Sequence, residues 1–344
     1  MPRVTVLLPV RDQAACLPRA MQSILRQRWH DLQLLVLDDG SEDGSGRLAA
    51  ETADARVRVH RSEQPVGLAA ILNQGLALSD SEYVARMDAD DWSHPERLAK
   101  QLAYLGERRD IAACGTAVTA IQPDGSRRLW RYPAAHDAIR ASLLFENVLA
   151  HPSSMLRRAT LETLDIRYDP SFEKSQDYDL WERLGRRARL GNLPGAYVEY
   201  RVSPPGDGGG VARQQRFADR VRLRQLQALG LDVGESELRL HSAISRWETA
   251  GFDLDAIEAW LQRLLQANVA SGIYRQDLLE GVVRERLFRA ARHAVLRDLG
   301  ALQRYRRSSL RGQGLRWRLR ELAAALRAWR QRAASARGGR HGRA

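Results

Sequence analysis

The sequence is poor in the residues that hold small secreted proteins together. Its 344 residues include two cysteines, Cys16 and Cys114, which lie in separate segments without metal-ligand spacing. So few cysteines are typical of a reducing compartment, and we expect two buried thiols rather than a disulfide framework. Residues 4–8 form too short an apolar run for a secretion signal, and no run approaches the roughly 20 residues of a membrane span. These absences predict a cytoplasmic protein.

The glycine-rich motifs of two large nucleotide-binding classes are also missing. No G-x-G-x-x-G follows the first expected strand, and no G-x-x-x-x-G-K-[ST] occurs. The first motif marks dinucleotide-binding domains and the second marks P-loop proteins. A nucleotide site in this chain must therefore be built in another way.

Net positive charge is confined to the C-terminal end. Residues 301–344 contain thirteen arginines, no lysine and one acid, Glu321, which together account for the net charge of +12. The other 300 residues carry equal numbers of basic and acidic side chains. The charge is therefore a property of the tail and not of the fold.

Short apolar runs alternate with amphipathic segments through the first third of the chain. Helical spacing is expected over residues 14–27, 43–53, 67–77 and 95–105, and strands over residues 4–10, 32–37, 57–60, 83–87 and 111–118. This alternation predicts a mostly parallel sheet with helices on both faces. Strands and helices are mixed over residues 127–200, including a strand and turn over 151–158, a helix start over 175–184 and a strand over 198–202.

The densest chemical signal is the acidic run Asp88, Asp90 and Asp91, directly after the expected strand 83–87. Crowded carboxylates are costly to bury unless a cation lies among them. Hard divalent cations prefer oxygen ligands, which favours a metal site. An acidic turn or a helix cap is the alternative, because aspartate is common in both.

Polar residues also follow the first two expected strands. Pro9 and Arg11 come after the first strand, and Asp38 and Asp39 come at the end of the second. The carboxyl ends of parallel strands meet at one edge of the sheet, where open α/β sheets bind ligands. Three polar clusters at one edge favour a nucleotide and metal site over three unrelated caps.

In their order and spacing, these motifs resemble those of family 2 glycosyltransferases with the GT-A fold. The resemblance covers about the first 200 residues. The matching pieces are Leu8-Pro9-Val10-Arg11, Leu37-Asp38-Asp39-Gly40-Ser41-Glu42-Asp43-Gly44-Ser45, Gly67-Leu68-Ala69 with Asn73-Gln74-Gly75, Ala85-Arg86-Met87-Asp88-Ala89-Asp90-Asp91, Pro95-Glu96-Arg97-Leu98 with Gln101, His151-Pro152-Ser153, and Gln176-Asp177-Tyr178-Asp179-Leu180-Trp181.

The resemblance implies an inverting, metal-dependent glycosyltransferase that uses Mn²⁺ or Mg²⁺. It would move a single sugar from a nucleotide-diphosphate sugar, with UDP as the expected nucleotide, to a hydroxyl of a glycan or lipid-linked acceptor. The Q-x-x-R-W motif of processive synthases is absent, which favours transfer of one sugar. Ser203 stands where the family often has a histidine after its Tyr-Arg run, so a phosphate contact there is not expected to be conserved.

The resemblance also assigns roles to individual residues. Asp177 would be the general base, and Asp90 would hold the metal. The nucleotide would contact Pro9, Arg11, Asp38, Asp39, Gly67, Asn73, Arg86 and Asp88. The acceptor or phosphate side would include Asp91, His151, Gln176, Trp181 and Arg201. Simpler readings stay open, since Asp39 and Asp177 are also suited to helix capping, His151 to a structural role and Trp181 to the core.

A Pro/Gly-rich segment divides the chain. Residues 203–210 have the composition of a flexible lid or linker, and only helical periodicity follows, over 238–247, 254–266, 277–299 and 314–334. We expect a GT-A catalytic domain over residues 1–205, with the nucleotide and metal in its N-terminal half and the acceptor side in 120–205. A loop over 206–212, a helical region over 213–310 and a basic helix and tail over 311–344 would follow.

The basic tail has three interpretations. Leu315, Leu319, Leu322, Leu326 and Trp329 recur at helical spacing among arginines. A basic amphipathic helix of this kind suits an anionic membrane surface, which would place the protein on the inner face of the cytoplasmic membrane. Packing on the catalytic domain or in an oligomer through the C-terminal helices is the second interpretation. Nucleic acid is the least favoured partner, although arginine-rich helices also bind phosphate backbones.

Two other functional classes remain open. A sugar-phosphate nucleotidyltransferase would share the sheet and the metal site but usually carries a Gly-rich, Lys/Arg-containing signature near the first strand, which this chain lacks. A catalytically silent module that binds nucleotide-sugars is the other alternative. Catalysis with and without a divalent metal, in the wild type and in Asp177→Asn, separates the three.

Overall fold

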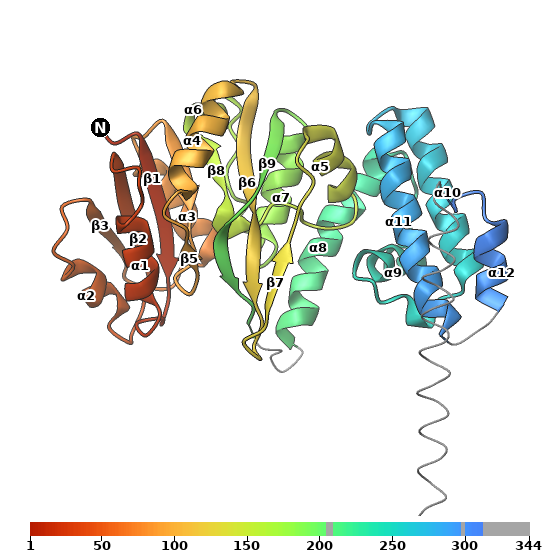
Figure 1. The fold of residues 1–344 in the computed structure, drawn as a ribbon, viewed down its shortest axis with the longest axis horizontal. Helices are drawn as coiled ribbons and strands as arrows, with labels where there is room; N and C mark the ends of the chain where they lie inside the picture. The colour runs from red at the N-terminus through yellow and green to blue at the C-terminus, as the bar shows by residue number, and fades with distance from the viewer. Residues whose placement is uncertain (204–208, 297–299, 312–344) are drawn as a thin grey trace, which may run out of the picture. The chain divides into compact units, whose positions relative to one another are not determined.

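The computed structural model describes residues 1–203, 209–296 and 300–311, which fall into two compact units (Figure 1). The first unit contains residues 1–143 and 147–221, and the second contains residues 144–146 and the described residues from Arg222 onward. The first unit carries the sheet and the second consists of helices.

A nine-stranded mixed sheet forms the centre of the first unit, in the order β3-β2-β1-β4-β8-β6-β9-β5 with β7 beside β6. Its first four strands are all parallel, namely β1 (Val4–Val10), β2 (Leu32–Asp39), β3 (Val57–Ser62) and β4 (Tyr83–Arg86). Their carboxyl ends therefore lie at one edge, as the polar motifs after β1, β2 and β4 predict.

In the second half of the sheet, one short strand, β8 (Met155–Arg157), runs opposite to both of its neighbours. This strand is antiparallel to both β4 and β6 (Ile111–Ile121), so β6 runs in the direction of β4, and β9 (Arg189–Arg201) is parallel to β6. Two short antiparallel partners complete the sheet, β7 (Arg127–Trp130) on β6 and β5 (Trp92–Ser93) on β9. The predicted α/β class is confirmed, with antiparallel pairs at β8, β7 and β5.

Helices cover both faces of the sheet, and the period-two pattern of β1 shows why. Val4, Val6 and Leu8 join one apolar cluster, whereas Leu7 joins the cluster on the other face. Fully burying such a side chain contributes about 1.5–3 kcal/mol to stability. The helices of this unit are α1 (Leu17–Leu25), α2 (Ser45–Ala50), α3 (Leu68–Ala77), α4 (Arg97–Glu107), α5 (His136–Leu143), α6 (Arg158–Thr163), α7 (Gln176–Gly185) and the first half of α8 (Gly209–Ala228).

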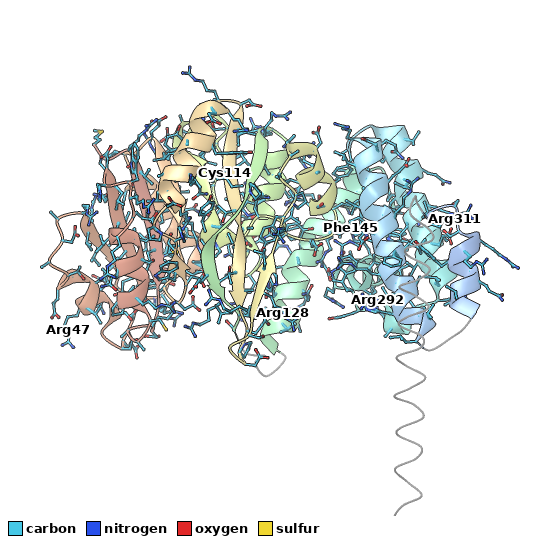
Figure 2. The ribbon with its side chains drawn as sticks, viewed as in Figure 1. Arg47, Cys114, Arg128, Phe145, Arg292 and Arg311 are labelled. Atoms are coloured by element: carbon cyan, nitrogen blue, oxygen red, sulfur yellow. The ribbon has the colours of Figure 1, made fainter. Side chains whose placement is uncertain are left out.

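Three local expectations differ from the structure. Residues 151–153 form a short helical turn rather than a strand, since Pro152 suits the first turn of a helix. The strand expected over 198–202 is the end of the much longer β9. Cys114 is fully buried within the sheet, and Figure 2 labels it there, but Cys16 is only half-buried at the start of α1.

The two units meet later in the chain than the sequence suggests. The expected boundary loop ended at residue 212, but α8 already begins at Gly209, and the first unit extends to Val221. Ala218 and Val221 belong to the apolar core of the first unit. The first half of α8 is therefore part of the first unit, and residues 204–208 of the expected loop lie outside the described residues.

The second unit is helical, as predicted. Besides the end of α8, it contains α9 (Glu235–Ser245), a short turn (Thr249–Gly251), α10 (Leu254–Ser271), α11 (Gln276–Val295) and α12 (Gly300–Arg307). Burial lowers the pKa of His241 to about 3, and its neutral ring lies between the carbonyl of Leu144 and the indole N–H of Trp260. Among the described residues, no helix has the length and apolar character needed to cross a membrane. The amphipathic helix expected over 311–344 lies outside the described residues, Arg311 excepted.

Candidate active site

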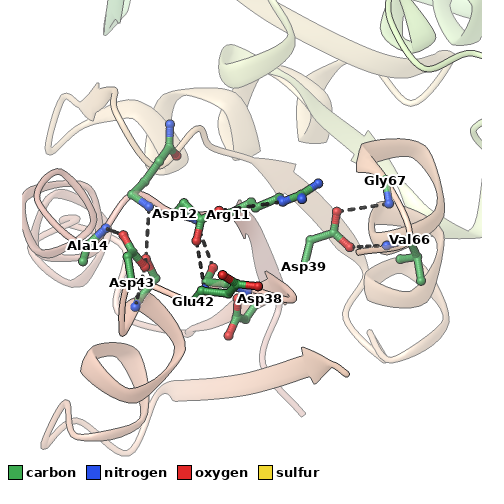
Figure 3. Close-up of polar contacts among 12 residues, drawn as sticks. Arg11, Asp12, Ala14, Asp38, Asp39, Glu42, Asp43, Val66 and Gly67 are labelled. Atoms are coloured by element: carbon green, nitrogen blue, oxygen red, sulfur yellow. Dashed lines mark hydrogen bonds and ion pairs between the residues drawn. The ribbon is translucent and has the colours of Figure 1, made fainter. Parts of the chain in front are cut away.

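The loops after β1 and β2 are fastened to each other by carboxylates and hydroxyls (Figure 3). Asp12 accepts the backbone N–H of Glu42 at 2.9 Å and donates its own to the hydroxyl of Ser41 at 3.1 Å. Asp43 accepts the N–H of Ala14 at 2.8 Å. The hydroxyl of Ser45, together with backbone N–H groups, lowers the pKa of Asp43. The acidic Asp-Asp-Gly-Ser-Glu-Asp motif thus builds the edge of the sheet before any ligand binds.

Asp38 and Asp39 at the end of β2 point in different directions. Asp39 accepts the N–H groups of Val66 at 2.7 Å and Gly67 at 3.0 Å, at the start of α3 (Figure 3). Asp38 has no exposed surface and accepts the N–H of Ser41 at 2.9 Å. A Cβ on Gly46 would lie 2.0 Å from Oδ2 of Asp38, so this carboxylate faces α2. The geometry therefore argues against the predicted nucleotide contact of Asp38.

Three of the other predicted nucleotide residues also differ in access. Pro9 is buried within β1, whereas Arg11 is exposed at the same edge. Both polar groups of the Asn73 side chain bind the backbone of Tyr168, at 2.8 Å and 3.0 Å. Asn73 thus ties α3 to a distant loop, and the predicted nucleotide contact is not supported. Arg11 and Gly67, at the start of α3, are exposed at this edge, whereas Asp39 is largely buried between them.

The predicted acidic cluster forms at the end of β4. One carboxylate oxygen from each of Asp88, Asp90 and Asp91 lies within 4.8 Å of the others. Asp91 is buried, and its Oδ1 accepts the backbone N–H of Arg201 at 2.7 Å. Its Oδ2 is buried without a hydrogen-bond partner. The structure thus places Asp91 in the acidic cluster rather than on the predicted acceptor side.

The electrostatics of this cluster are those of a cation site. Burial, followed by the charge of Asp88, raises the pKa of Asp91 to about 8, and the same two causes raise the pKa of Asp90. Carboxylate oxygens are the ligands that Mg²⁺ and Mn²⁺ prefer. A divalent cation would give the unpartnered Oδ2 of Asp91 a bonding partner and would offset the repulsion among the three carboxylates. The residues present therefore fit such an ion.

A buried arginine holds the strand end that carries these acids. Arg97 has no exposed surface, and its guanidinium donates to the carbonyls of Arg86 at 2.7 Å and Ser154 at 3.1 Å. Burial lowers the pKa of Arg97 to about 9. Gln101 accepts from Arg97 at 3.0 Å and donates to the carbonyl of Ser153 at 2.8 Å. The motif at 95–101 therefore positions the acidic cluster without touching a ligand.

A pocket of about 390 Å³ brings the end of β4 together with the start of α7. Asp88, its ion-pair partner Arg86 and Asp177 all line this pocket. Asp177 is half-buried, and burial raises its pKa. Its Oδ2 accepts a hydrogen bond of 2.7 Å from the amide of Asn147. The predicted base and the first acid of the cluster therefore face the same space.

The start of α7 is shaped by an unusual backbone. Ser175 precedes the helix with a φ of 57°, in the left-handed region that costs a residue with a side chain roughly 1–2 kcal/mol. Its hydroxyl donates to the carbonyl of Gln214 in α8 at 3.2 Å. Strain of this kind tends to persist where surrounding contacts over-determine it, often at functional sites.

The remaining predicted acceptor-side residues are divided by the structure. Trp181 has no exposed surface and belongs to the core, so the predicted acceptor contact is wrong. His151 and Gln176 are largely buried but line the pocket. Nε2 of His151 lies 2.8 Å from the hydroxyl of Tyr168, and burial lowers the pKa of this histidine well below its usual value. Arg201 lies on the metal side, with Nε 3.4 Å from the carbonyl of Asp90.

Sequence reasoning did not identify several residues that line the pocket. Asn147 orients Asp177, and its Oδ1 is itself held by the N–H of Leu149 at 3.1 Å. Trp130 of β7 and Tyr200 of β9 lie with ring centroids 5.7 Å apart, which gives the pocket an aromatic wall. Nothing in the sequence distinguished Asn147, because its partner is thirty residues away. The aromatic pair depends on the neighbouring strands β7, β6 and β9, whose pairing was not predicted.

Comparisons with known proteins agree with this geometry. A family profile described as "Glycosyl transferase family 2" matches residues 5–164. The chain is 30% identical over 207 residues to an Escherichia coli O-antigen biosynthesis glycosyltransferase, WbnJ. This match covers 58% of this chain and 79% of the relative. It is 27% identical over 212 residues to an uncharacterized glycosyltransferase of Haemophilus influenzae, and there the chain spans 66% of the relative's length.

A solved structure shares the fold. The structure of S. aureus TarS residues 1–349 in complex with UDP superimposes with a TM-score of 0.54 at 16% identity. The match covers 96% of this chain and 91% of TarS 1–349. At this level of identity the likeness concerns the arrangement of helices and strands, including helices after the sheet-bearing unit.

Proposed function

The chain belongs to glycosyl transferase family 2, and we propose that it transfers a single sugar from a nucleotide-diphosphate sugar to a hydroxyl of a glycan or lipid-linked acceptor, with inversion and with a divalent metal. UDP is the proposed nucleotide. One observation carries the proposal, namely that Asp88 of the acidic cluster and Asp177 line the same pocket. An inverting transfer needs a proton acceptor and a leaving-group site on opposite sides of one sugar.

Asp177 suits the role of the proton acceptor. Its pKa is raised by burial, which makes the carboxylate a stronger base than an exposed aspartate. Its Oδ2 is fixed by the Asn147 amide, and Oδ1 accepts the N–H of Tyr178 at 2.8 Å, so the group enters the pocket in one orientation. The acceptor hydroxyl would bind beside it and lose its proton to Asp177 as the new glycosidic bond forms.

The opposite side of the pocket suits the diphosphate. Mn²⁺ or Mg²⁺ held by Asp90, with Asp88 and Asp91, would neutralise the negative charge that develops on the leaving phosphates. The buried guanidinium of Arg86 is already paired with Asp88 and lines the pocket. The nucleotide would extend from there toward Arg11, Asp39 and Gly67 at the ends of β1 and β2 and the start of α3.

A comparison of the wild type with Asp177→Asn tests the proposal. Thermal unfolding is measured with a panel of nucleotide-sugars, with Mn²⁺ or with a chelator, and the nucleotide product is then identified. The cognate donor stabilises the native state by about 2.7 kcal/mol at 100 times its Kd. Asp177→Asn should keep this metal-dependent stabilisation and lose roughly 10²–10⁴-fold in transfer rate, because a general base has been removed.

Three outcomes contradict the proposal. Release of pyrophosphate rather than a nucleoside diphosphate would point to a nucleotidyltransferase. Donor binding with no turnover of any kind would point to a silent binding module. An Asp177→Asn variant that transfers sugar at the wild-type rate would remove Asp177 from the mechanism.

The proposed location on the inner face of the cytoplasmic membrane depends on the C-terminal tail. The supporting observation is the excess of arginine over acid in residues 301–344. Such segments are attracted to anionic lipid surfaces. This proposal rests on the sequence pattern, because residues 312–344 lie outside the described residues.

A further inference from the structure

A second hollow adjoins the pocket of Asp177 and has a different character. It encloses about 680 Å³ and is lined largely by cationic side chains, namely Lys174, Arg213, Arg216 and Arg220. Glu173 and Lys174 line both this hollow and the pocket that contains Asp177 and Asp88. The two spaces are therefore continuous on the side of α7 and α8. We call the second one the α8 groove.

The cations of the α8 groove are arranged by helix geometry. Arg213, Arg216 and Arg220 occupy positions i, i+3 and i+7 of α8, which lie on one face of a helix. Lys174 comes from the segment that precedes α7. All four residues are exposed and belong to the first unit. One helical face thus presents a row of positive charge toward the segment next to the base.

Two of these cations are already engaged by the protein. Arg213 forms an ion pair with Glu173, which is the acid among the described residues that line the groove. Arg220 donates to the carbonyl and the hydroxyl of Ser171, both at 3.1 Å, and its guanidinium lies 4.2 Å from the ring centroid of Phe172. These contacts hold Arg220 in place, and among the described residues it forms no ion pair, although its charge helps to lower the pKa of Asp169.

Lys174 and Arg216 provide the binding capacity. Among the residues that the structure describes, their side chains make no hydrogen bond or ion pair. With Glu173 offsetting Arg213, the groove retains the charges of Lys174, Arg216 and Arg220. Positive charges left unpaired beside a pocket favour an anionic ligand, and guanidinium groups match phosphate oxygens through paired N–H donors.

We propose that the α8 groove binds a phosphate group carried by the acceptor, which extends into the groove while its hydroxyl lies at Asp177. This inference deepens the proposed function and rests on it. The donor's own diphosphate is expected at the opposite wall, where Asp88, Asp90 and Asp91 select a metal-bound group. The described residues that line the α8 groove include no such acid cluster, and the groove suits direct contact between phosphate and cationic side chains.

Two kinds of acceptor carry such a phosphate. A lipid-linked acceptor has a diphosphate between its sugar and its prenyl chain, whereas a phosphodiester-linked glycan has one phosphate per repeat. Geranyl diphosphate and a synthetic glycerol-phosphate hexamer represent the two sources. Their binding to the full chain is measured by isothermal titration calorimetry, with UDP and Mn²⁺ present so that the donor side is filled.

The double variant Lys174→Glu/Arg216→Glu tests the groove, and Arg109→Glu is the matched control. Arg109 is exposed, makes no hydrogen bond or ion pair with other described residues, and lies before β6, at the opposite edge of the sheet. We expect the wild type and the control to bind at least one probe with the same Kd. The double variant should bind that probe at least tenfold more weakly, and added salt should weaken the wild-type binding.

The outcomes separate this inference from the proposed function. If neither probe binds the wild type, or if the double variant binds as the wild type does, the α8 groove does not bind acceptor phosphate. Metal-dependent hydrolysis of the donor reports on the proposed function and should be equal in the wild type and in the single variant Arg216→Glu, because Arg216 lines the α8 groove but not the pocket of Asp177. A milder variant, Arg216→Gln with Lys174→Gln, should show an intermediate Kd, which a loss of folding would not produce.

Discussion

Two groups of aspartates follow β2 and β4, the parallel strands on either side of β1, and their surroundings differ. At the end of β2, Asp38, Asp39 and Asp43 accept backbone N–H groups. At the end of β4, Asp88, Asp90 and Asp91 crowd one another, and one buried oxygen of Asp91 has no hydrogen-bond partner. Oδ2 of Asp38 also has no hydrogen-bond partner, but it lies 3.4 Å from the guanidinium Nε of Arg61. Donors and a cation of the protein itself thus meet the first group, whereas the second group is crowded by its own charges and fits a divalent cation.

The pKa values express the same contrast. Hydrogen bonds lower the pKa of Asp43, so its charged form is favoured in the folded protein. Burial and neighbouring charge raise the pKa of Asp90 and Asp91, so their charged forms are disfavoured without a metal. An acidic motif can thus be a scaffold or a binding site, and the difference is whether backbone donors reach its oxygens.

The largest effect is expected when a negative charge is removed from the β4 group. Asp90→Asn should lower sugar transfer by about 10²–10³-fold, because the leaving phosphates lose a group that stabilises their charge through the metal. The stabilisation that Mn²⁺ gives to the folded protein should fall with it. Transfer assays and melting curves with and without Mn²⁺ measure both effects.

Asp38→Asn is the control for that experiment. Asp38 is a fully buried acid in the β2 group, and its carboxylate faces Ser41, Gly46 and the guanidinium of Arg61. Its replacement should leave the stabilisation by Mn²⁺ unchanged. An equal loss of the Mn²⁺ effect in both variants would contradict the division into a scaffold and a binding site.

The second test concerns what holds the β4 group in place. Arg97→Met keeps a long side chain but removes the donors to the carbonyls of Arg86 and Ser154. The carbonyl of Ser154 keeps the backbone N–H of Arg86 as a donor at 3.0 Å, so the main cost is the lost donor to the buried carbonyl of Arg86. The free energy of unfolding should therefore fall by about 1–3 kcal/mol. Denaturant unfolding measures this loss, and a change below about 0.5 kcal/mol would show that Arg97 does not hold the strand end.

The fold was largely predictable because its signals are local. Apolar runs of β1, β2 and β4 and the amphipathic helices between them follow from spacing alone, and Asp88 to Asp91 could be placed at a strand end. Asp38 and Asp39, by contrast, are identical neighbours in the sequence. Only the positions of Gly46 and of the Val66 and Gly67 amides show that Asp38 faces α2 and that Asp39 faces the start of α3.

The parts that were not predicted depend on contacts between distant segments. Asn147 meets Asp177 across thirty residues, and Asn73 meets Tyr168 across ninety-five. Trp181 follows Asp177 by four residues in α7, a spacing that suits a shared face, yet it is fully buried in the core of the first unit. The strand pairing in the second half of the sheet was not predicted for the same reason, because the pairing of β6 with β9 joins residues about eighty apart.

A smaller effect separates the two residues at the end of β2. Asp39→Asn can accept only one of the two N–H groups of Val66 and Gly67, so stability should fall by about 1–2 kcal/mol. If Asp39 also contacts the nucleotide base, the Kd for UDP should rise at least tenfold. Asp38→Asn should lose stability but keep the Kd for UDP, as calorimetry with Mn²⁺ can measure.

The smallest effects are in the pH dependence of stability, and they should have opposite signs in the two groups. In metal-free protein the pKa of Asp91 is raised to about 8. Between about pH 4 and pH 8 the folded state therefore keeps a proton on Asp91, whereas the unfolded state has lost it. Stability from this residue therefore falls as the pH rises through that window. Asp91→Asn should stabilise the chelator-treated protein at pH 8, with a gain that shrinks toward pH 5.

Asp43 should behave in the opposite way. Its lowered pKa favours the charged form in the folded state, so the contribution of Asp43 is present at neutral pH and is lost as the pH falls through its folded pKa. Asp43→Asn should therefore destabilise the protein at pH 7 and have less effect near pH 3. Denaturant titrations of the wild type and both variants over this range measure the differences. Adding Mn²⁺ should turn Asp91→Asn from stabilising to destabilising and leave Asp43→Asn unchanged, because only the β4 group needs a cation to complete it.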